Sequence, residues 1–475
     1  MIDKRKIYDI LSVLVSSGVL LLSGILTNLI VPKIMGVVNY GYYKIFILYG
    51  TYIALTHMGI VDGILLKYGG KSLNNDDLIL IRSYLRVLFY FSVTIAIVLI
   101  IIALYIFKGY IRWIILFLGM QVIISNLFYY LQYLTQALMR FKTFSFFNIL
   151  QALLNIGSTT VIYILKKIGY LSILSYKIYI PIYLLIYLII LLGYLINLKD
   201  LVFGKVKSFF QVNNDIWNLI KIGFPVTVSY QIATLVFNID NQFISMFFST
   251  VIFGLYSFAY SMVSIVTTIL NTLSTVIFPN LNRLNLDNAI KNYSKLIMLL
   301  LMLVYLMVMV YYPVEIIVKL FLPEYLESLI YFKIVIPGVG ISSCISLIIF
   351  NYFKTLKKGH IYFIYGCSIL VLAIILNSLI YFATHSAIAI AGMSLVILFS
   401  WYLLTNSYLV RNYHVAYKKN TFYMLSMMLV FEIDVLNIKN MFYSIIIYLI
   451  SYALITFLVY KNDSYKLKRK FIFNK

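Results

Sequence analysis

The sequence predicts an all-α membrane protein that crosses the bilayer many times. Of its 475 residues, 63% are hydrophobic and only 11% are charged. Apolar runs of about 20 residues, the length that spans a bilayer as a helix, recur along almost the whole chain. A soluble protein of this length could not bury so much apolar surface in its cores. An outer-membrane barrel is excluded, because its strands would show short alternating patterns.

Fourteen helical segments account for these runs in chain order. The first follows a basic head, MIDKRK, and its apolar stretch continues to Val31, so we expect a retained helix and no cleaved signal peptide. The thirteenth is short and ends in FEID, which leaves twelve spans plus a re-entrant or surface helix as the alternative. The expected spans are 9–31, 42–60, 84–107, 112–136, 144–165, 171–197, 220–246, 251–278, 294–318, 328–350, 360–382, 387–410, 421–435 and 440–460.

Charge predicts the orientation of these spans. The formal net charge is +23, and every loop on one side of the bilayer is basic when the N-terminus is placed in the cytoplasm. We therefore expect a multi-pass protein with both termini in the cytoplasm. The bases are spread over short loops between apolar spans, which favours contact with membrane lipids and argues against a nucleic-acid partner.

The longest polar interruption divides the chain into two halves. It covers residues 198–219 and is expected to be a basic cytoplasmic linker. The predicted domains are an N-lobe of six spans at 1–197, a C-lobe of six spans at 220–412, and the last two helices with a basic tail at 413–475. Segments around Gly41 and Gly254 resemble each other, as do QALMRFKTFSFF and NYFKTLKKGHIY, at nearly the same offset. A parallel duplication typical of transporters explains both pairs, and chance similarity between apolar segments is the alternative.

Polar side chains recur at helical spacing on the first, second, seventh and eighth spans. These are equivalent spans of the two proposed halves, so one hydrated cavity between the halves would explain all four stripes. The alternative is that Ser and Thr bond their own helix backbone and small polar residues mediate helix packing. The residues predicted to line the cavity are Tyr49, Tyr52, Thr56, Gln231, Asn238, Asn241, Tyr256, Tyr260 and Asn271.

Asp240 is a carboxylate within an otherwise apolar span, VFNIDNQFISMFF. On a continuous helix it lies about 140° from the line of the seventh-span stripe, so it is expected to face the second bundle and not the cavity. A cation or proton site is the functional interpretation of such a residue. The structural alternative is a carboxylate that a neighbouring base neutralises or that is simply protonated.

Enzyme motifs are absent from the sequence. There is no GxxxxGK[ST] phosphate loop and no HExxH or GxSxG motif, and the four histidines and two cysteines lack metal-ligand spacing. We therefore expect no catalytic residues, no cofactor, and no metal other than a coupling Na⁺.

Seven motifs follow one another along the first twelve predicted spans. They are VPKIMGVVNYGYYKIF, HMGIVDGILLKYGG, LTQALMRFKTF, IKIGFPVTVSYQIATLVFNIDNQFIS, FGLYSFAYSM, FLPEYLESL and AIAIAGMSLV. Their order and spacing resemble those of polysaccharide flippases of the multidrug/oligosaccharidyl-lipid/polysaccharide superfamily. The resemblance implies two six-helix lobes in a V around a central cavity in the bacterial cytoplasmic membrane. It also implies export of undecaprenyl-diphosphate-linked oligosaccharide repeat units by ion-coupled alternating access, alongside polysaccharide polymerase or assembly proteins.

The resemblance also implies roles for individual residues. A sodium site of this superfamily would correspond to Asp240, Asn377 and Ser394, with Na⁺ and H⁺ both open as the coupling ion. The second acid of that site is missing, because Tyr381 stands one helical turn beyond Asn377. Asn241 occupies a position that is often basic in polysaccharide flippases.

Few cations are available to meet the diphosphate. Relatives that flip the peptidoglycan precursor carry arginines in the first two spans, whereas the first span here has none, which counts against that substrate. The remaining candidates are Lys44, Lys177 and Lys221. Two other functions stay open: a multidrug/cation antiporter, which the neutral stripes disfavour, and a non-transporting scaffold of a glycan-assembly complex.

Overall fold

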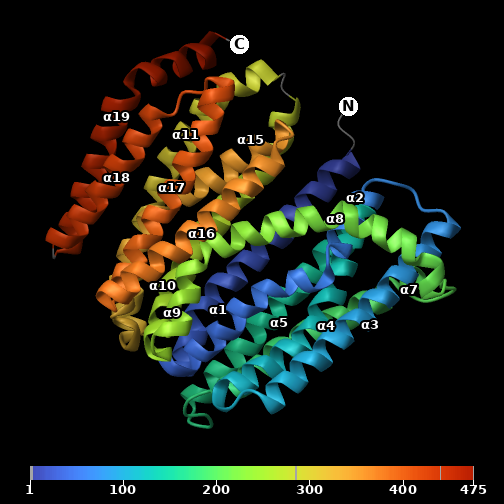
Figure 1. Cartoon of the computed structure of the whole chain (residues 1–475). Helices are drawn as coiled ribbons and strands as arrows, with labels where there is room; N and C mark the ends of the chain where they lie inside the picture. Colours follow the sequence, from blue (N-terminus) through green and yellow to red (C-terminus); the bar gives the residue numbers. More distant parts are fainter. Residues whose placement is uncertain (1–3, 284–285, 439, 474–475) are drawn as a thin grey trace. The chain divides into compact units, whose positions relative to one another are not determined.

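A computed structural model describes the backbone of residues 4–283, 286–438 and 440–473, and the side chains of residues 11–270, 290–438 and 440–461. Every regular element in these ranges is helical (Figure 1). The chain forms two compact units: Met1–Leu235 with Ser249–Gly254, and Val236–Phe248 with Leu255–Lys475. The predicted division of the chain into two lobes joined by the 198–219 linker stays a prediction.

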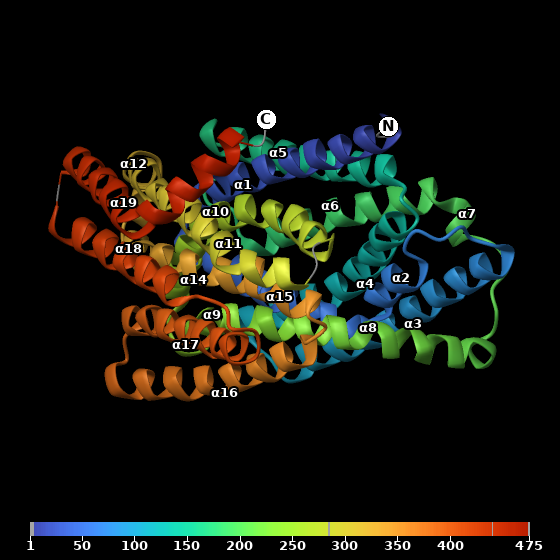
Figure 2. The ribbon, with the colours of Figure 1, turned by 90° about the horizontal axis from the view of Figure 1, so that it is seen from above.

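The first unit contains the helices up to nearly the end of α8. α1 packs along α5, and the two run side by side in Figure 2. A buried cluster that includes Tyr84, Leu131 and Leu219 joins α3, α4 and α8. The elements are α1 Lys4–Gly50, η1 Thr51–His57, α2 Ile60–Tyr68, α3 Asn75–Tyr105, α4 Gly109–Ala137, α5 Phe141–Lys167, α6 Tyr176–Asn197, α7 Lys199–Val202 and α8 Phe209–Phe237.

The second unit contains most of the remaining helices. Two of its spans change helix type along their length: one has a 3₁₀ turn at η2 Val308–Val310, and the other has a 3₁₀ turn at η4 Ile336–Gly338 and a π-helical turn at η5 Cys344–Ile349. A further 3₁₀ turn, η3 Pro323–Tyr325, lies between these two spans. The α-helices are α9 Ile239–Phe247, α10 Thr250–Arg283, α11 Leu286–Met307, α12 Tyr311–Phe321, α13 Ser328–Val335, α14 Val339–Ser343, α15 Phe350–Thr355, α16 Gly359–Thr384, α17 Ala387–Tyr413, α18 Lys418–Asn437 and α19 Met441–Phe473.

Local sequence explains where several of these helices begin. Asn74 and Asp77 form a reciprocal capping box at the start of α3. The side chains of Ser175 and Ser386 accept backbone N–H groups at the starts of α6 and α17. These caps satisfy N–H groups that have no partner in the first turn of a helix.

Twelve helices in the described residues are long and apolar enough to cross a membrane, so the chain is a multi-pass membrane protein. The count differs from fourteen at two places. The predicted spans 9–31 and 42–60 are counted once among the twelve, although α1 consists of two helices that meet at a kink at Gly36, where φ is 66° and ψ is 168°, a conformation open to glycine. The predicted thirteenth span corresponds to α18, which is not among the twelve and carries Lys418, Lys419, Glu432 and Asp434.

The start of α2 crosses α8 at direct backbone contact. Gly59, at φ 82°, is one member of the crossing, and a Cβ built on Gly223 would lie 2.0 Å from its carbonyl oxygen. Any side chain at Gly223 must therefore push the two segments apart. This crossing, together with the buried cluster around Leu219, explains why α8 packs with the first unit.

Gly223→Ala should destabilise the protein by about 1–3 kcal/mol, because the added methyl group overpacks the crossing. An unfolding titration of the purified protein in mixed detergent micelles measures the change. Gly157→Ala is the matched control, since a Cβ at Gly157 meets nothing within 4 Å. Equal stability of the two variants would contradict the close crossing.

Candidate functional site

The predicted seventh span is broken where its acidic residue lies. α8 ends at Phe237, Asn238 has the non-helical angles φ −118° and ψ 12°, and α9 begins at Ile239. The predicted single helix over 220–246 therefore differs from the structure. A helical-wheel angle measured along α8 does not carry across Asn238, so the predicted orientation of Asp240 has to be replaced by its observed contacts.

Asp240 is 1% exposed and is held by hydroxyl and amide donors. The Tyr256 hydroxyl donates to Asp240 Oδ2 at 2.6 Å, and the Tyr260 hydroxyl donates to the same oxygen. Both tyrosines lie on one face of α10, a helical turn apart. The backbone N–H of Asn241 donates to Asp240 Oδ1 at 2.7 Å, and its amide lies 3.4 Å from that oxygen. Asn241, Tyr256 and Tyr260, three of the residues predicted to line the cavity, thus contact Asp240.

Two helices that pack against α9 supply the other predicted ion ligands. Ser394 of α17 lies near the Asp240 carboxylate, and its hydroxyl donates to the carbonyl of Ala391 at 2.7 Å. Asn377 of α16 is fully buried, and neither its amide oxygen nor its amide nitrogen has a partner among the described residues. One turn further along α16, the Tyr381 ring packs against Phe247 of α9 at 4.8 Å.

The Asp240 cluster lacks a basic partner. Within the described side chains, the one ion pair is between Lys319 and Glu315. A buried carboxylate without a counter-charge is costly unless it takes up a proton or a cation. Hydroxyl, amide and carboxylate oxygens are hard ligands of the kind that Na⁺ accepts. This arrangement can therefore hold a proton or a monovalent cation.

The predicted cavity residues of the first unit make contacts of their own. The Tyr49 and Tyr52 rings lie 6.4 Å apart, and Thr56 accepts a hydrogen bond from the Asn126 amide at 2.9 Å. Gln231 of α8 is 1% exposed and donates to the carbonyl of Thr51 at 2.9 Å, while its Oε1 has no partner in the described part of the chain. These contacts fit helix packing, and a substrate role for the four residues stays a prediction.

Asn238 and Asn271 are the two remaining residues that are predicted to line the cavity. Asn238 lies at the break between α8 and α9 and is partly buried. Asn271 lies outside the residues whose side chains the structure describes.

The three predicted headgroup cations have different surroundings. Lys44 lies over the Tyr40 ring at 5.3 Å, and the exposed Lys177 lies over the Trp113 ring at 4.8 Å. Lys221 is exposed on α8. Their role in binding a diphosphate stays a prediction.

Sequence reasoning gave no role to Asp62, which lies in the HMGIVDG motif. The Thr227 hydroxyl of α8 donates to the Asp62 carboxylate. Burial raises the pKa of Asp62, and this hydrogen bond offsets part of the rise. Two features of the sequence could have predicted this contact: Asp62 is an isolated acid three residues after Gly59, and Thr227 is a hydroxyl one helical turn after Gly223.

Comparison with solved structures identifies the fold. The structure of the lipid II flippase MurJ in an inward closed conformation matches with a TM-score of 0.65 and 14% identity, over 96% of this chain and 99% of that chain. The MATE transporter ClbM in complex with Rb⁺ matches with a TM-score of 0.49 and 14% identity, over 84% of this chain and 92% of that chain. No protein-family model and no curated protein matches the sequence. The chain thus shares an all-α membrane fold with the flippase of the first match.

Tyr256→Phe should destabilise the protein by about 1–3 kcal/mol, because buried Asp240 loses a hydroxyl donor that water does not replace. In an Asp240→Asn background the same change should cost about 1 kcal/mol less, since the charged acceptor is gone. Unfolding titrations of the four proteins measure this coupling. Tyr170→Phe is the control, because Tyr170 is 80% exposed and its loss should be nearly neutral. Identical costs of Tyr256→Phe in both backgrounds would rule out the hydrogen bond.

Proposed function

We propose that the protein is a flippase for undecaprenyl-diphosphate-linked oligosaccharide repeat units. It moves them from the inner to the outer leaflet of the bacterial cytoplasmic membrane for surface polysaccharide biosynthesis, by ion-coupled alternating access. The observation that carries the proposal is the fold shared with a lipid-linked-sugar flippase over nearly the full length of both chains. The polar residues on the predicted cavity stripes support it, because hydroxyl and amide groups suit a hydroxylated headgroup.

Such a protein lowers the free-energy cost of moving a polar headgroup out of water, and it makes or breaks no covalent bond. A charged, hydroxylated headgroup meets a high barrier in hydrocarbon, whereas its polyprenyl tail can stay in the lipid. Side chains such as Tyr49, Tyr52 and Gln231 would replace water around the sugars. Lys44, Lys177 and Lys221 are the proposed contacts of the diphosphate, and N-terminal and C-terminal segments in the cytoplasm follow from the basic loops.

The proposed substrate is an oligosaccharide repeat unit and not the peptidoglycan precursor. The motifs quoted above resemble polysaccharide flippases, and the first predicted span, 9–31, contains no arginine that could meet a diphosphate. Fold similarity at 14% identity is compatible with either substrate. The substrate proposal therefore depends on the residues of this chain.

Asp240, with Ser394 and Asn377, is proposed to bind the coupling ion. The buried carboxylate has no base beside it among the described residues, and the unpaired Asn377 amide lies on a helix packed against α9. Binding and release of Na⁺ or H⁺ at this cluster would shift the balance between two transport states, provided the ion binds one state more tightly.

Depletion of the protein in its native cell should cause undecaprenyl-linked repeat units to accumulate on the inner leaflet and surface polysaccharide to fall. Mass spectrometry of lipid-linked intermediates and staining of surface glycan measure both. A depletion strain that expresses the intact protein from a second locus is the control. Normal surface polysaccharide after depletion would refute the proposal, and altered drug sensitivity without a glycan defect would point to the antiporter.

Asp240→Asn should lower ion-dependent flipping at least about tenfold in proteoliposomes, because a neutral amide binds a cation or proton far more weakly. Flipping of a fluorescent undecaprenyl-diphosphate oligosaccharide is measured with and without gradients of Na⁺ and of H⁺. Asp76→Asn, at an exposed acid, should leave the rate unchanged. Asp240→Asn with unaltered ion dependence would return Asp240 to a structural role.

A further inference from the structure

A second buried carboxylate lies in the last turn of α18. Asp434 is 4% exposed, and its Oδ2 accepts the Tyr312 hydroxyl of α12 at 2.7 Å and the Ser444 hydroxyl of α19 at 2.6 Å. The two hydroxyl oxygens lie 3.0 Å apart. Three helices of the second unit thus meet at one carboxylate.

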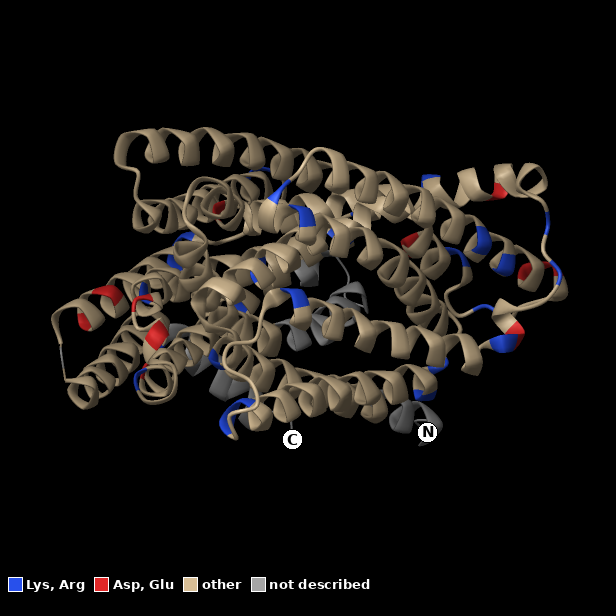
Figure 3. Cartoon of the chain, turned by 90° about the horizontal axis from the view of Figure 1, so that it is seen from below, with Lys and Arg blue, Asp and Glu red and all other residues tan. Residues whose placement is uncertain are grey.

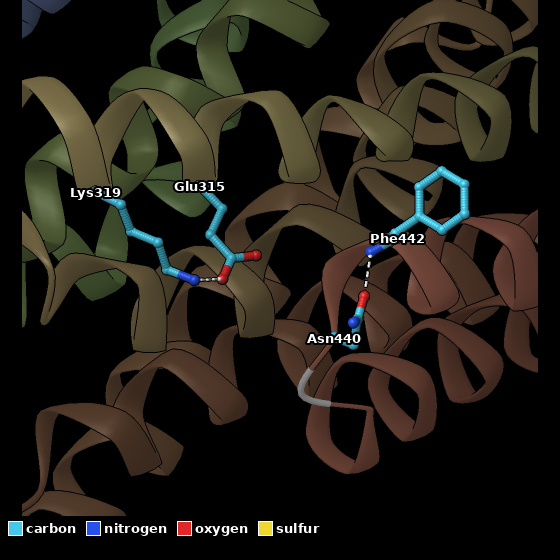
Figure 4. A network of polar contacts seen from close by, with 4 residues as sticks. All are labelled: Glu315, Lys319, Asn440 and Phe442. Carbon is cyan, nitrogen blue, oxygen red and sulfur yellow. Dashed lines mark hydrogen bonds and ion pairs between the residues drawn. The ribbon is translucent and has the colours of Figure 1, made fainter.

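The other carboxylate oxygen, Asp434 Oδ1, has no hydrogen-bond partner among the described residues. A buried polar atom in this state loses its hydration without compensation. The one ion pair in the described part of the chain joins Lys319 to Glu315, both on α12, at 2.6 Å (Figure 4). No described base therefore lies within ion-pair distance of Asp434. Among the described residues, the Asp434 carboxylate therefore has neither a counter-charge nor a hydrogen-bond donor for Oδ1.

Asp434 lies at the negative end of α18. The C-terminal end of a helix carries a partial negative charge, and the backbone carbonyl of Asp434 already lies in that last turn, where it accepts the Ile438 N–H at 2.9 Å. Figure 3 shows acidic and basic positions interspersed at the left end of the view. Of the described bases, Lys319 pairs with Glu315, and Lys439, five residues along the chain from Asp434, lies outside the described residues.

A proton would not complete the site. Protonation of Oδ1 removes the charge, but it places an unpaired O–H donor in the same buried position. A divalent ion is also a poor fit, since no group of three or more His, Cys, Asp or Glu in the described residues could hold a metal. A monovalent cation satisfies Oδ1, neutralises the carboxylate and accepts hydroxyl oxygens as additional ligands.

We propose that Asp434, with the hydroxyl oxygens of Tyr312 and Ser444, binds a monovalent metal cation of the Na⁺ class, separately from Asp240. The cation joins the hairpin of α18 and α19 to α12. Binding is independent of the transported substrate, so the site stands whether or not the flippase proposal is correct.

Binding of ²²Na⁺ to the purified full-length protein in detergent tests the site. Asp240→Asn removes the first candidate site, and this variant should still bind Na⁺ and still gain thermal stability in NaCl relative to choline chloride at equal ionic strength. Adding Asp434→Asn should weaken the remaining binding by about tenfold or more, and adding Ser444→Ala should weaken it several-fold. Adding Glu327→Gln, at an exposed acid, should leave the affinity unchanged.

Loss of all Na⁺ binding in Asp240→Asn alone would overturn the proposal. So would a stability of Asp240→Asn that responds to pH but not to Na⁺, which would indicate protonation. If the variant with Asp434→Asn does not fold, the Ser444→Ala variant decides, and an unchanged Na⁺ affinity there refutes the site. No substrate enters this assay, so its failure is distinct from failure of the transport assay.

Discussion

A carboxylate taken out of water must find donors or a cation, and this constraint organises the polar interior of the second unit. Asp240 draws Tyr256 and Tyr260 from α10, and Ser394 from α17, to one point on α9. Asp434 draws Tyr312 and Ser444 together in the same way. In both places the described partners are neutral donors and not bases, so the helices are held around a carboxylate whose charge no described base neutralises.

The two carboxylates differ in how completely they are satisfied. Both oxygens of Asp240 accept hydrogen bonds, whereas one oxygen of Asp434 accepts none from the described residues. A saturated carboxylate can tolerate the absence of an ion more easily than an unsaturated one, because less hydration energy is left uncompensated. Asp240 is thus suited to an ion that comes and goes, and Asp434 to one that stays as part of the structure.

Much of the fold could be predicted from hydrophobic run length, since the twelve membrane-crossing helices fall on the predicted apolar segments. The errors arise where a single backbone angle decides the path. Asn238 is one more polar residue of a regular stripe, so the periodicity does not mark the break there. The contact between Asp240 and the two tyrosines could not be predicted from helical spacing that assumes an unbroken helix. The grouping of Asp240 with Asn377 and Ser394 is implied by the family resemblance alone, because the proximity of residues on different helices depends on tertiary packing that one sequence cannot reveal.

The close crossing of Gly59 and Gly223 bears on how such a chain can be recombined. The predicted division of the chain at the polar segment 198–219 suggests that segment as the place to exchange halves between relatives. Such an exchange would separate α8 from the glycine, Asp62 and core side chains that accommodate it. A crossover at Asn238 would keep α8 with its partners and α9 with Asp240 and its tyrosines. The natural seam for shuffling segments between relatives therefore lies at the break between α8 and α9, two residues before the buried acid.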